Sequence, residues 1–119
     1  MGKAQIVFEC DFPKGKFVTY NDEPQIDKKS LNQVHGKIIT QSSKASPLVE
    51  ADGIYQSNDS RDTLAIRTAD CLPIVVFGNH GNALLHAGWR GVELNIMSTQ
   101  EVVDLAPNLF FLGPHIRSE

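Results

Sequence analysis

The apolar positions of this chain fall into short runs separated by polar segments that contain glycine, proline, asparagine or serine. Short apolar runs bounded by turn-forming residues predict β-strands. In one run, residues 63–69, alternation places Leu64 and Ile66 on one face and so predicts a buried strand. The strands predicted outside the centre of the chain are residues 5–8 (QIVF), 17–20 (FVTY), 33–40 (QVHGKIIT, broken by a glycine), 63–69 (TLAIRTA) and 109–112 (LFFL).

The two strongest apolar runs are residues 72–77 (LPIVVF) and 83–87 (ALLHA), with GNHGN between them. Glycine and asparagine tolerate the positive φ angles of tight turns, so the pattern predicts a β-hairpin. A turn centred on His80 places Ile74 opposite His86.

Residues 92–106 (VELNIMSTQEVVDLA) form the one long helical candidate. Val92, Ile96 and Val103 lie roughly on one side of such a helix, and Pro107 ends it. Several strands with one or two helices indicate an α+β domain.

Composition narrows the class of protein. A chain of 119 residues, 41% hydrophobic and 21% charged, is expected to form a single domain over residues 1–119 with a modest core. Its net charge of −3 and scattered cations argue against a nucleic-acid partner, and its apolar runs are too short to cross a membrane. With two cysteines and no apolar leader near the N-terminus, we expect a cytoplasmic protein with reduced thiols.

Cys71 and His86 are the candidates for chemistry, although the residues by themselves leave their role open. Each is equally at home in a protein core, as an inert thiol or a hydrogen-bonded imidazole. In the predicted hairpin, alternation puts Cys71 on the face opposite His86, which argues against a shared site. Pro73 weakens that objection, because proline marks strand starts, edges and bulges. Asp52 and Asp70, each after an alanine, are interpreted as turn-forming residues.

Five sequence words occur in a fixed order: NQVHG, ADGI, TADCLPIVVF, LLHAGWRG and FLGPHI. Together they resemble the YfiH-like family, also called the laccase-domain or polyphenol-oxidase-like family, from about Asn32 to Ile116. The resemblance implies mixed β-sheets covered by helices in an α/β/β/α sandwich. Family members are longer at both ends, so we expect a shortened member whose fold is incomplete relative to the family.

The resemblance also implies a site. The family's functional residues match His35, Cys71 and His86, which form one catalytic centre able to hold zinc. A thiolate and two imidazoles suit Zn²⁺ and leave a fourth position for water or substrate. Copper is not expected as the cofactor, since the four histidines of the chain are too few for a multicopper oxidase.

The activity implied is that of a purine nucleoside phosphorylase acting on adenosine, inosine or methylthioadenosine, with adenosine deamination as a second activity. Arg90, Arg67 and Asp70 are then the candidates for binding substrate and phosphate. Two alternatives stay open: an amide hydrolase that edits peptidoglycan precursors at the same residues, and a shortened relative without catalysis. The expected partner is a small molecule, and the sequence leaves the oligomeric state open.

Overall fold

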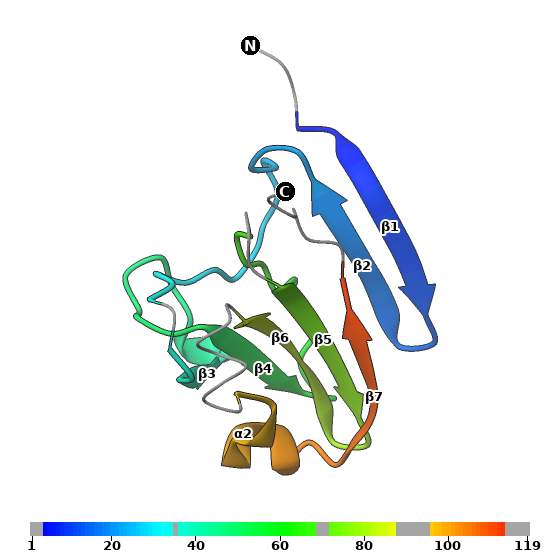
Figure 1. Ribbon diagram of the computed structural model, residues 1–119, viewed down its shortest axis with the longest axis vertical. Helices are drawn as coiled ribbons and strands as arrows, with labels where there is room; N and C mark the ends of the chain where they lie inside the picture. Colours follow the sequence, from blue (N-terminus) through cyan, green and yellow to red (C-terminus); the bar gives the residue numbers. More distant parts are fainter. Residues whose placement is uncertain (1–3, 35, 69–71, 88–95, 114–119) are drawn as a thin grey trace, which may run out of the picture.

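The computed structural model describes residues 4–34, 36–68, 72–87 and 96–113, which form two β-sheets and short helical segments (Figure 1). This architecture confirms the predicted α+β class. The elements are β1 (Ile6–Phe12), β2 (Gly15–Tyr20), β3 (Ile39–Gln41), η1 (Ser42–Lys44), β4 (Gly53–Ser57), β5 (Leu72–Gly78), β6 (Gly81–Ala87), η2 (Ile96–Ser98), α2 (Gln100–Val103) and β7 (Pro107–Leu112).

The larger sheet has the strand order β3-β4-β6-β5-β7, and β1 and β2 form a separate antiparallel hairpin. β3 and β4 run parallel, whereas the other neighbours in the larger sheet are antiparallel. The predictions of strands at 17–20 and 109–112 are confirmed, each within a slightly longer strand, and the strand predicted at 5–8 is found one residue later, from Ile6, and extends to Phe12.

The hairpin of β5 and β6 lies at the centre of the larger sheet and confirms the prediction from GNHGN. Its register differs from the expected one by a single residue, because Pro73 is the partner of His86. The strands extend to Gly78 and Gly81, which leaves a two-residue turn instead of one centred on His80. Both glycines are required, since a Cβ would meet the carbonyl oxygen of Leu105 at one and of Gln56 at the other.

One face of the larger sheet is apolar and is covered by η2 and α2, which lie near the turn end of the central hairpin (Figure 1). Strand alternation directs every second side chain of β5 and β6 to this face. The buried residues of the cluster are Ile39, Ile74, Val76, Ala83, Leu85, Ala87, Ile96, Val102 and Leu105.

The helix predicted over 92–106 is wrong where the structure describes it. Only η2 and the four-residue α2 are helical there, because Thr99 between them is extended at φ −66° and ψ 156°. The Thr99 hydroxyl donates to the carbonyl of Ile96 at 3.0 Å, a local bond that competes with a continuous helix. The expected apolar side is also shifted by one residue, since Val102 is 1% exposed and Val103 53%.

Two predicted strands are wrong for a shared reason: side chains take the backbone hydrogen bonds that a strand would need. The segment 63–69 makes an isolated bridge at Leu64, and the Gln33 side chain bonds to the backbone of Arg67 nearby. Among the described residues of 33–40, strand β3 begins only at Ile39, since the N–H groups of Val34 and Gly36 donate to a carboxylate.

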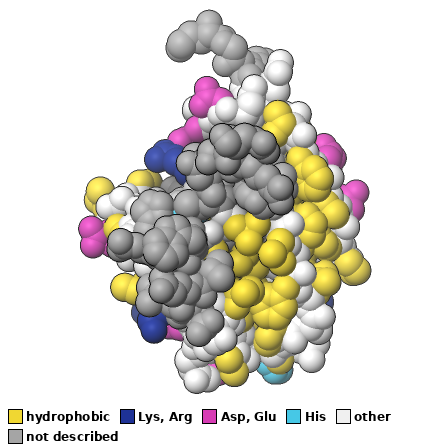
Figure 2. Space-filling view, in the orientation of Figure 1, with side chains coloured by type: hydrophobic (Ala, Val, Ile, Leu, Met, Phe, Trp, Pro, Cys, Tyr) yellow, Lys and Arg dark blue, Asp and Glu magenta, His cyan; other side chains and the backbone are white. Residues whose placement is uncertain are grey.

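The opposite face of the sheet is covered in two parts. Over β5 and β7, the hairpin of β1 and β2 packs through phenylalanines, with Phe12 and Phe77 ring centroids 5.0 Å apart and Phe17 and Phe111 5.4 Å apart. Over β4, loop residues pack against Ile54 in a smaller apolar cluster. Figure 2 shows hydrophobic side chains gathered on the flank formed by β7 and the hairpin. No helix among the described residues is long and apolar enough to span a membrane.

Candidate functional site

A buried acid–imidazole pair lies on this second face, at the end of β6 away from the hairpin turn. The Nδ1 atom of His86 is 2.9 Å from Oδ1 of Asp52, and the two side chains are 3% and 0% exposed. Asp52 immediately precedes β4, which pairs with β6, and the His86 N–H donates to the Asp52 carbonyl at 2.7 Å. The backbone pairing therefore holds the two side chains together.

Asp52 also binds the segment that precedes β3. Its Oδ2 atom accepts the N–H groups of Gly36 at 2.8 Å and Val34 at 3.3 Å. Its own N–H donates to the carbonyl of Ile38 at 2.8 Å. One carboxylate thus connects the two neighbours of position 35 to His86.

The ADG word has a structural explanation in these contacts. Ala51 and Asp52 are fully buried, and a Cβ on Gly53 would come within 2.8 Å of Leu85 Cδ2 and 3.0 Å of Ile39 Cγ1. Glycine therefore allows β4 to fit between its neighbours while Asp52 faces the opposite side. The sequence interpretation of Asp52 as a turn former missed its contact with His86. The sequence did contain one sign of this contact, because Asp52 is an acidic residue between two small residues at the start of a strand.

Two further contacts bring the sequence words together. The Gln33 side-chain amide donates to the Arg67 carbonyl and accepts the Arg67 N–H, both at 2.7 Å. This joins the segment leading to position 35 with the segment leading to position 71. Pro73, as the strand partner of His86, shares its face of the sheet. The observed register thus removes the alternation argument against a Cys71–His86 site.

The Arg67 side chain is 83% exposed and binds Glu23, with 2.6 Å between Nη2 and Oε1. Lys28 binds the other carboxylate oxygen of Glu23 at 3.2 Å. The hydrogen bond from Arg67, then that from Lys28, holds the pKa of Glu23 below its usual range. As a phosphate ligand, Arg67 would have to exchange this carboxylate for the anion.

Of the predicted site residues, the structure describes His86 and Arg67. Among the described residues, no hydrogen bond joins these two side chains, since Arg67 binds Glu23 and His86 binds Asp52. His35, Asp70, Cys71 and Arg90 lie outside the described residues. Within the described ranges, no group of three or more His, Cys, Asp or Glu side chains could hold a metal ion.

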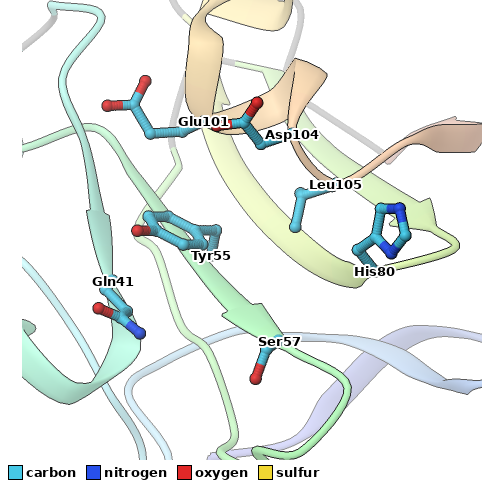
Figure 3. A pocket seen from close by; sticks show the side chains of 7 residues that line it. All are labelled: Gln41, Tyr55, Ser57, His80, Glu101, Asp104 and Leu105. Atoms are coloured by element: carbon cyan, nitrogen blue, oxygen red, sulfur yellow. The ribbon is translucent and has the colours of Figure 1, made fainter.

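A separate hollow of about 210 Å³ lies near the turn end of the central hairpin, on the face covered by α2 (Figure 3). Glu101 of α2 and Asp104, which directly follows α2, border it on one side and the Tyr55 ring on another. It is lined by Gln41, Tyr55, Ser57, His80, Glu101, Asp104 and Leu105. Two carboxylates without a Lys or Arg in the lining disfavour phosphate, so this hollow does not suit the predicted reaction.

Comparison with known proteins decides the family. The family described as multi-copper polyphenol oxidoreductase laccase matches residues 20–119. The chain belongs to this family. A relative from Aquifex aeolicus, named purine nucleoside phosphorylase, is 37% identical over 107 residues, which cover 77% of this chain and 51% of that protein. Escherichia coli YfiH, also named purine nucleoside phosphorylase, is 37% identical over 93 residues, covering 72% of this chain and 37% of YfiH. These relatives confirm the YfiH-like resemblance.

Solved structures agree with the fold. A Neisseria meningitidis protein superposes with a TM-score of 0.60 at 26% identity, covering 76% of this chain and 40% of that one. YlmD from Geobacillus stearothermophilus gives 0.55 at 29% identity, covering 75% and 40%. The chain therefore spans about half the length of the Aquifex relative and less of the others.

Proposed function

We propose that this chain carries the catalytic centre of a cytoplasmic purine nucleoside phosphorylase acting on adenosine, inosine or methylthioadenosine, with adenosine deamination as a second activity. The observation that carries the proposal is the buried Asp52–His86 pair. It joins His86 of the HAGWRG word to Asp52 of the ADG word, and the same carboxylate accepts the N–H groups of Val34 and Gly36 in the QVHG word. Two relatives that are each 37% identical to this chain over the matched residues are named for this activity.

In phosphorolysis, a phosphate oxygen attacks C1′ of the ribose while the bond from C1′ to the purine nitrogen breaks. The purine leaves with the bonding electron pair and gains a proton, and the sugar becomes ribose 1-phosphate, or 5-methylthioribose 1-phosphate when the substrate is methylthioadenosine. The imidazole of His86 is suited to hold or transfer that proton, with His35 and Cys71 as its partners in the site. Arg90, Arg67 and Asp70 are assigned to phosphate and substrate binding.

His35, Cys71 and His86 are the residues that would hold a metal. The donor set of one thiolate and two imidazoles fits Zn²⁺, and a carboxylate on Nδ1 of a ligating histidine is a usual companion of such sites. Bound zinc would polarise a substrate oxygen or lower the pKa of a bound water. The family description names copper, but a thiolate with two imidazoles does not make the several copper centres that a multicopper oxidase needs.

The test compares wild type with Cys71→Ala, using Cys10→Ala on β1 as the matched cysteine control. Release of free base from adenosine, inosine and methylthioadenosine is measured with and without inorganic phosphate, beside ammonia release and cleavage of a muramoyl-peptide precursor. We expect phosphate-dependent turnover in wild type and Cys10→Ala and none in Cys71→Ala.

Thermal unfolding of each protein, with and without chelator, separates a catalytic from a structural role. Cys71→Ala is expected to cost on the order of 1 kcal/mol of stability. A structural metal site would instead lose several kcal/mol on chelation. Full turnover in Cys71→Ala would remove Cys71 from the mechanism. Turnover of the muramoyl-peptide precursor alone would favour peptidoglycan editing. No turnover of any substrate would favour a non-catalytic relative.

A further inference from the structure

The two carboxylate oxygens of Asp52 have different tasks. Oδ2 accepts two backbone N–H groups, from Val34 and Gly36, and Oδ1 faces Nδ1 of His86 at 2.9 Å. A backbone N–H can only donate, so Oδ2 must be an acceptor. An ionised carboxylate accepts at both oxygens, and Nδ1 of His86 must then carry a proton.

We propose that Asp52 is a positioning residue that fixes the neutral His86 imidazole in the Nδ1–H form, leaving the lone pair on Nε2. The use of that lone pair in catalysis or zinc binding rests on the function proposed above, whereas the tautomer does not. Through Oδ2 the same residue sets the position of the backbone on both sides of position 35 relative to His86.

The position of Asp52 is determined from several sides, which is what a positioning role requires. Its N–H donates to Ile38 at 2.8 Å, its carbonyl accepts from the His86 N–H at 2.7 Å, and its side chain is fully buried. Neither the backbone nor the carboxylate can move without losing hydrogen bonds between buried groups.

This arrangement makes the Asp52→Asn variant unusually informative. The amide oxygen of Asn must take the place of Oδ2, because Val34 and Gly36 present N–H groups there. The NH₂ group is then left beside Nδ1 of His86, where it can only donate. The His86 imidazole must then accept a hydrogen bond at Nδ1, so its proton moves to Nε2. An Asp→Asn change of this kind in the serine-protease triad leaves the geometry intact and lowers kcat about ten-thousand-fold.

The experiment reads the His86 tautomer by ¹⁵N chemical shifts of the imidazole nitrogens in the metal-free full chain at about pH 9, above the usual imidazole pKa of about 6.5. Wild type, Asp52→Asn and the matched control Asp59→Asn, in an exposed turn, are compared. Assignment uses the loss of the His86 signals in His86→Gln. We expect the Nδ1–H form in wild type and Asp59→Asn and the Nε2–H form in Asp52→Asn. The Gly36 amide should stay protected from hydrogen exchange in all three.

A wild-type imidazole in the Nε2–H form, or an unchanged tautomer in a folded Asp52→Asn variant, would overturn the proposal. If Asp52→Asn does not fold, the wild-type tautomer decides alone. Zinc affinity, measured by competition with a chelator, should fall by about ten- to a hundredfold in Asp52→Asn and stay unchanged in Asp59→Asn. If wild type turns over no nucleoside, the proposed function fails while the tautomer result still stands.

Discussion

The two faces of the five-stranded sheet are built from the same strands and differ sharply in what they bury. On the face under η2 and α2, Ile74, Val76 and Leu85 pack in a cluster without charged members. On the other face, one residue further along β6, His86 is buried against Asp52. Alternation along a strand is enough to give neighbouring residues opposite environments.

The two faces therefore contribute differently to the stability of the protein and to the geometry of its candidate site. Burial of apolar area on the helical face supplies stability without needing any one partner. The part of the other face around His86 is held by hydrogen bonds whose loss leaves buried groups unsatisfied, so Asp52 and His86 are constrained in identity and not only in size. Substitutions on the helical face should therefore lower the stability of the whole fold, whereas substitutions at Asp52 or His86 should mainly disturb the site.

The largest effect is expected from Leu85→Ala, compared with Leu84→Ala on the opposite face. Leu85 is fully buried, so the cavity should cost about 2–5 kcal/mol, whereas the half-buried Leu84 should cost clearly less. Urea unfolding measures both. Turnover per folded molecule should survive in each variant, and equal losses at the two positions would contradict the assignment of the faces.

Asp52→Ala should have the next largest effect. It leaves Nδ1 of His86 and the N–H groups of Val34 and Gly36 without their carboxylate, at a cost of about 1–3 kcal/mol. Hydrogen exchange at Gly36 should accelerate more than exchange within β5, because the loss is local. A uniform acceleration over the sheet would show that Asp52 supports the apolar face as well.

A smaller effect is expected at Ala106, which links α2 to β7 with φ at 51°. An L-residue with a Cβ is strained by about 1–2 kcal/mol in this conformation, and glycine is not. Part of that relief is lost because glycine gains entropy in the unfolded chain. Ala106→Gly should therefore raise stability by less than about 1 kcal/mol, measured by thermal unfolding, and a lower melting temperature would exclude strain at this link.

The smallest effect concerns Glu23, whose side chain is 46% exposed, unlike the buried Asp52–His86 pair. Arg67 and Lys28 hold its pKa below the ordinary value of 4.5. The folded state thus binds fewer protons than the unfolded state near that pH, and the contribution is present above pH 4.5 and lost as pH falls through the lowered pKa. Glu23→Gln should flatten the decline in stability below pH 5 slightly. Added salt should shrink the difference, and a steeper decline in the variant would contradict the sign.

Local patterns predicted the central hairpin, the outer strands and the family words, because turn residues and apolar runs act over a few positions. They did not predict the hairpin register, which depends on a turn of two residues instead of one centred on His80. They placed strands at 33–40 and 63–69, where Asp52 and Gln33 take the backbone hydrogen bonds from far along the chain. The role of Asp52 was missed for the same reason, since its partner His86 is 34 residues away.

The strand order also fixes the sequence of events by which the site can form. β5 and β6 are joined by a two-residue turn, so they can pair within microseconds, about the time of an isolated hairpin. β4 can add to β6 only after the chain closes the longer loop between Ser57 and Leu72, which costs more entropy. Asp52 therefore meets His86 in a later step than the one that forms the hairpin. A folding intermediate that has the central hairpin but not β4 would hold most of the apolar cluster on the helical face and no site.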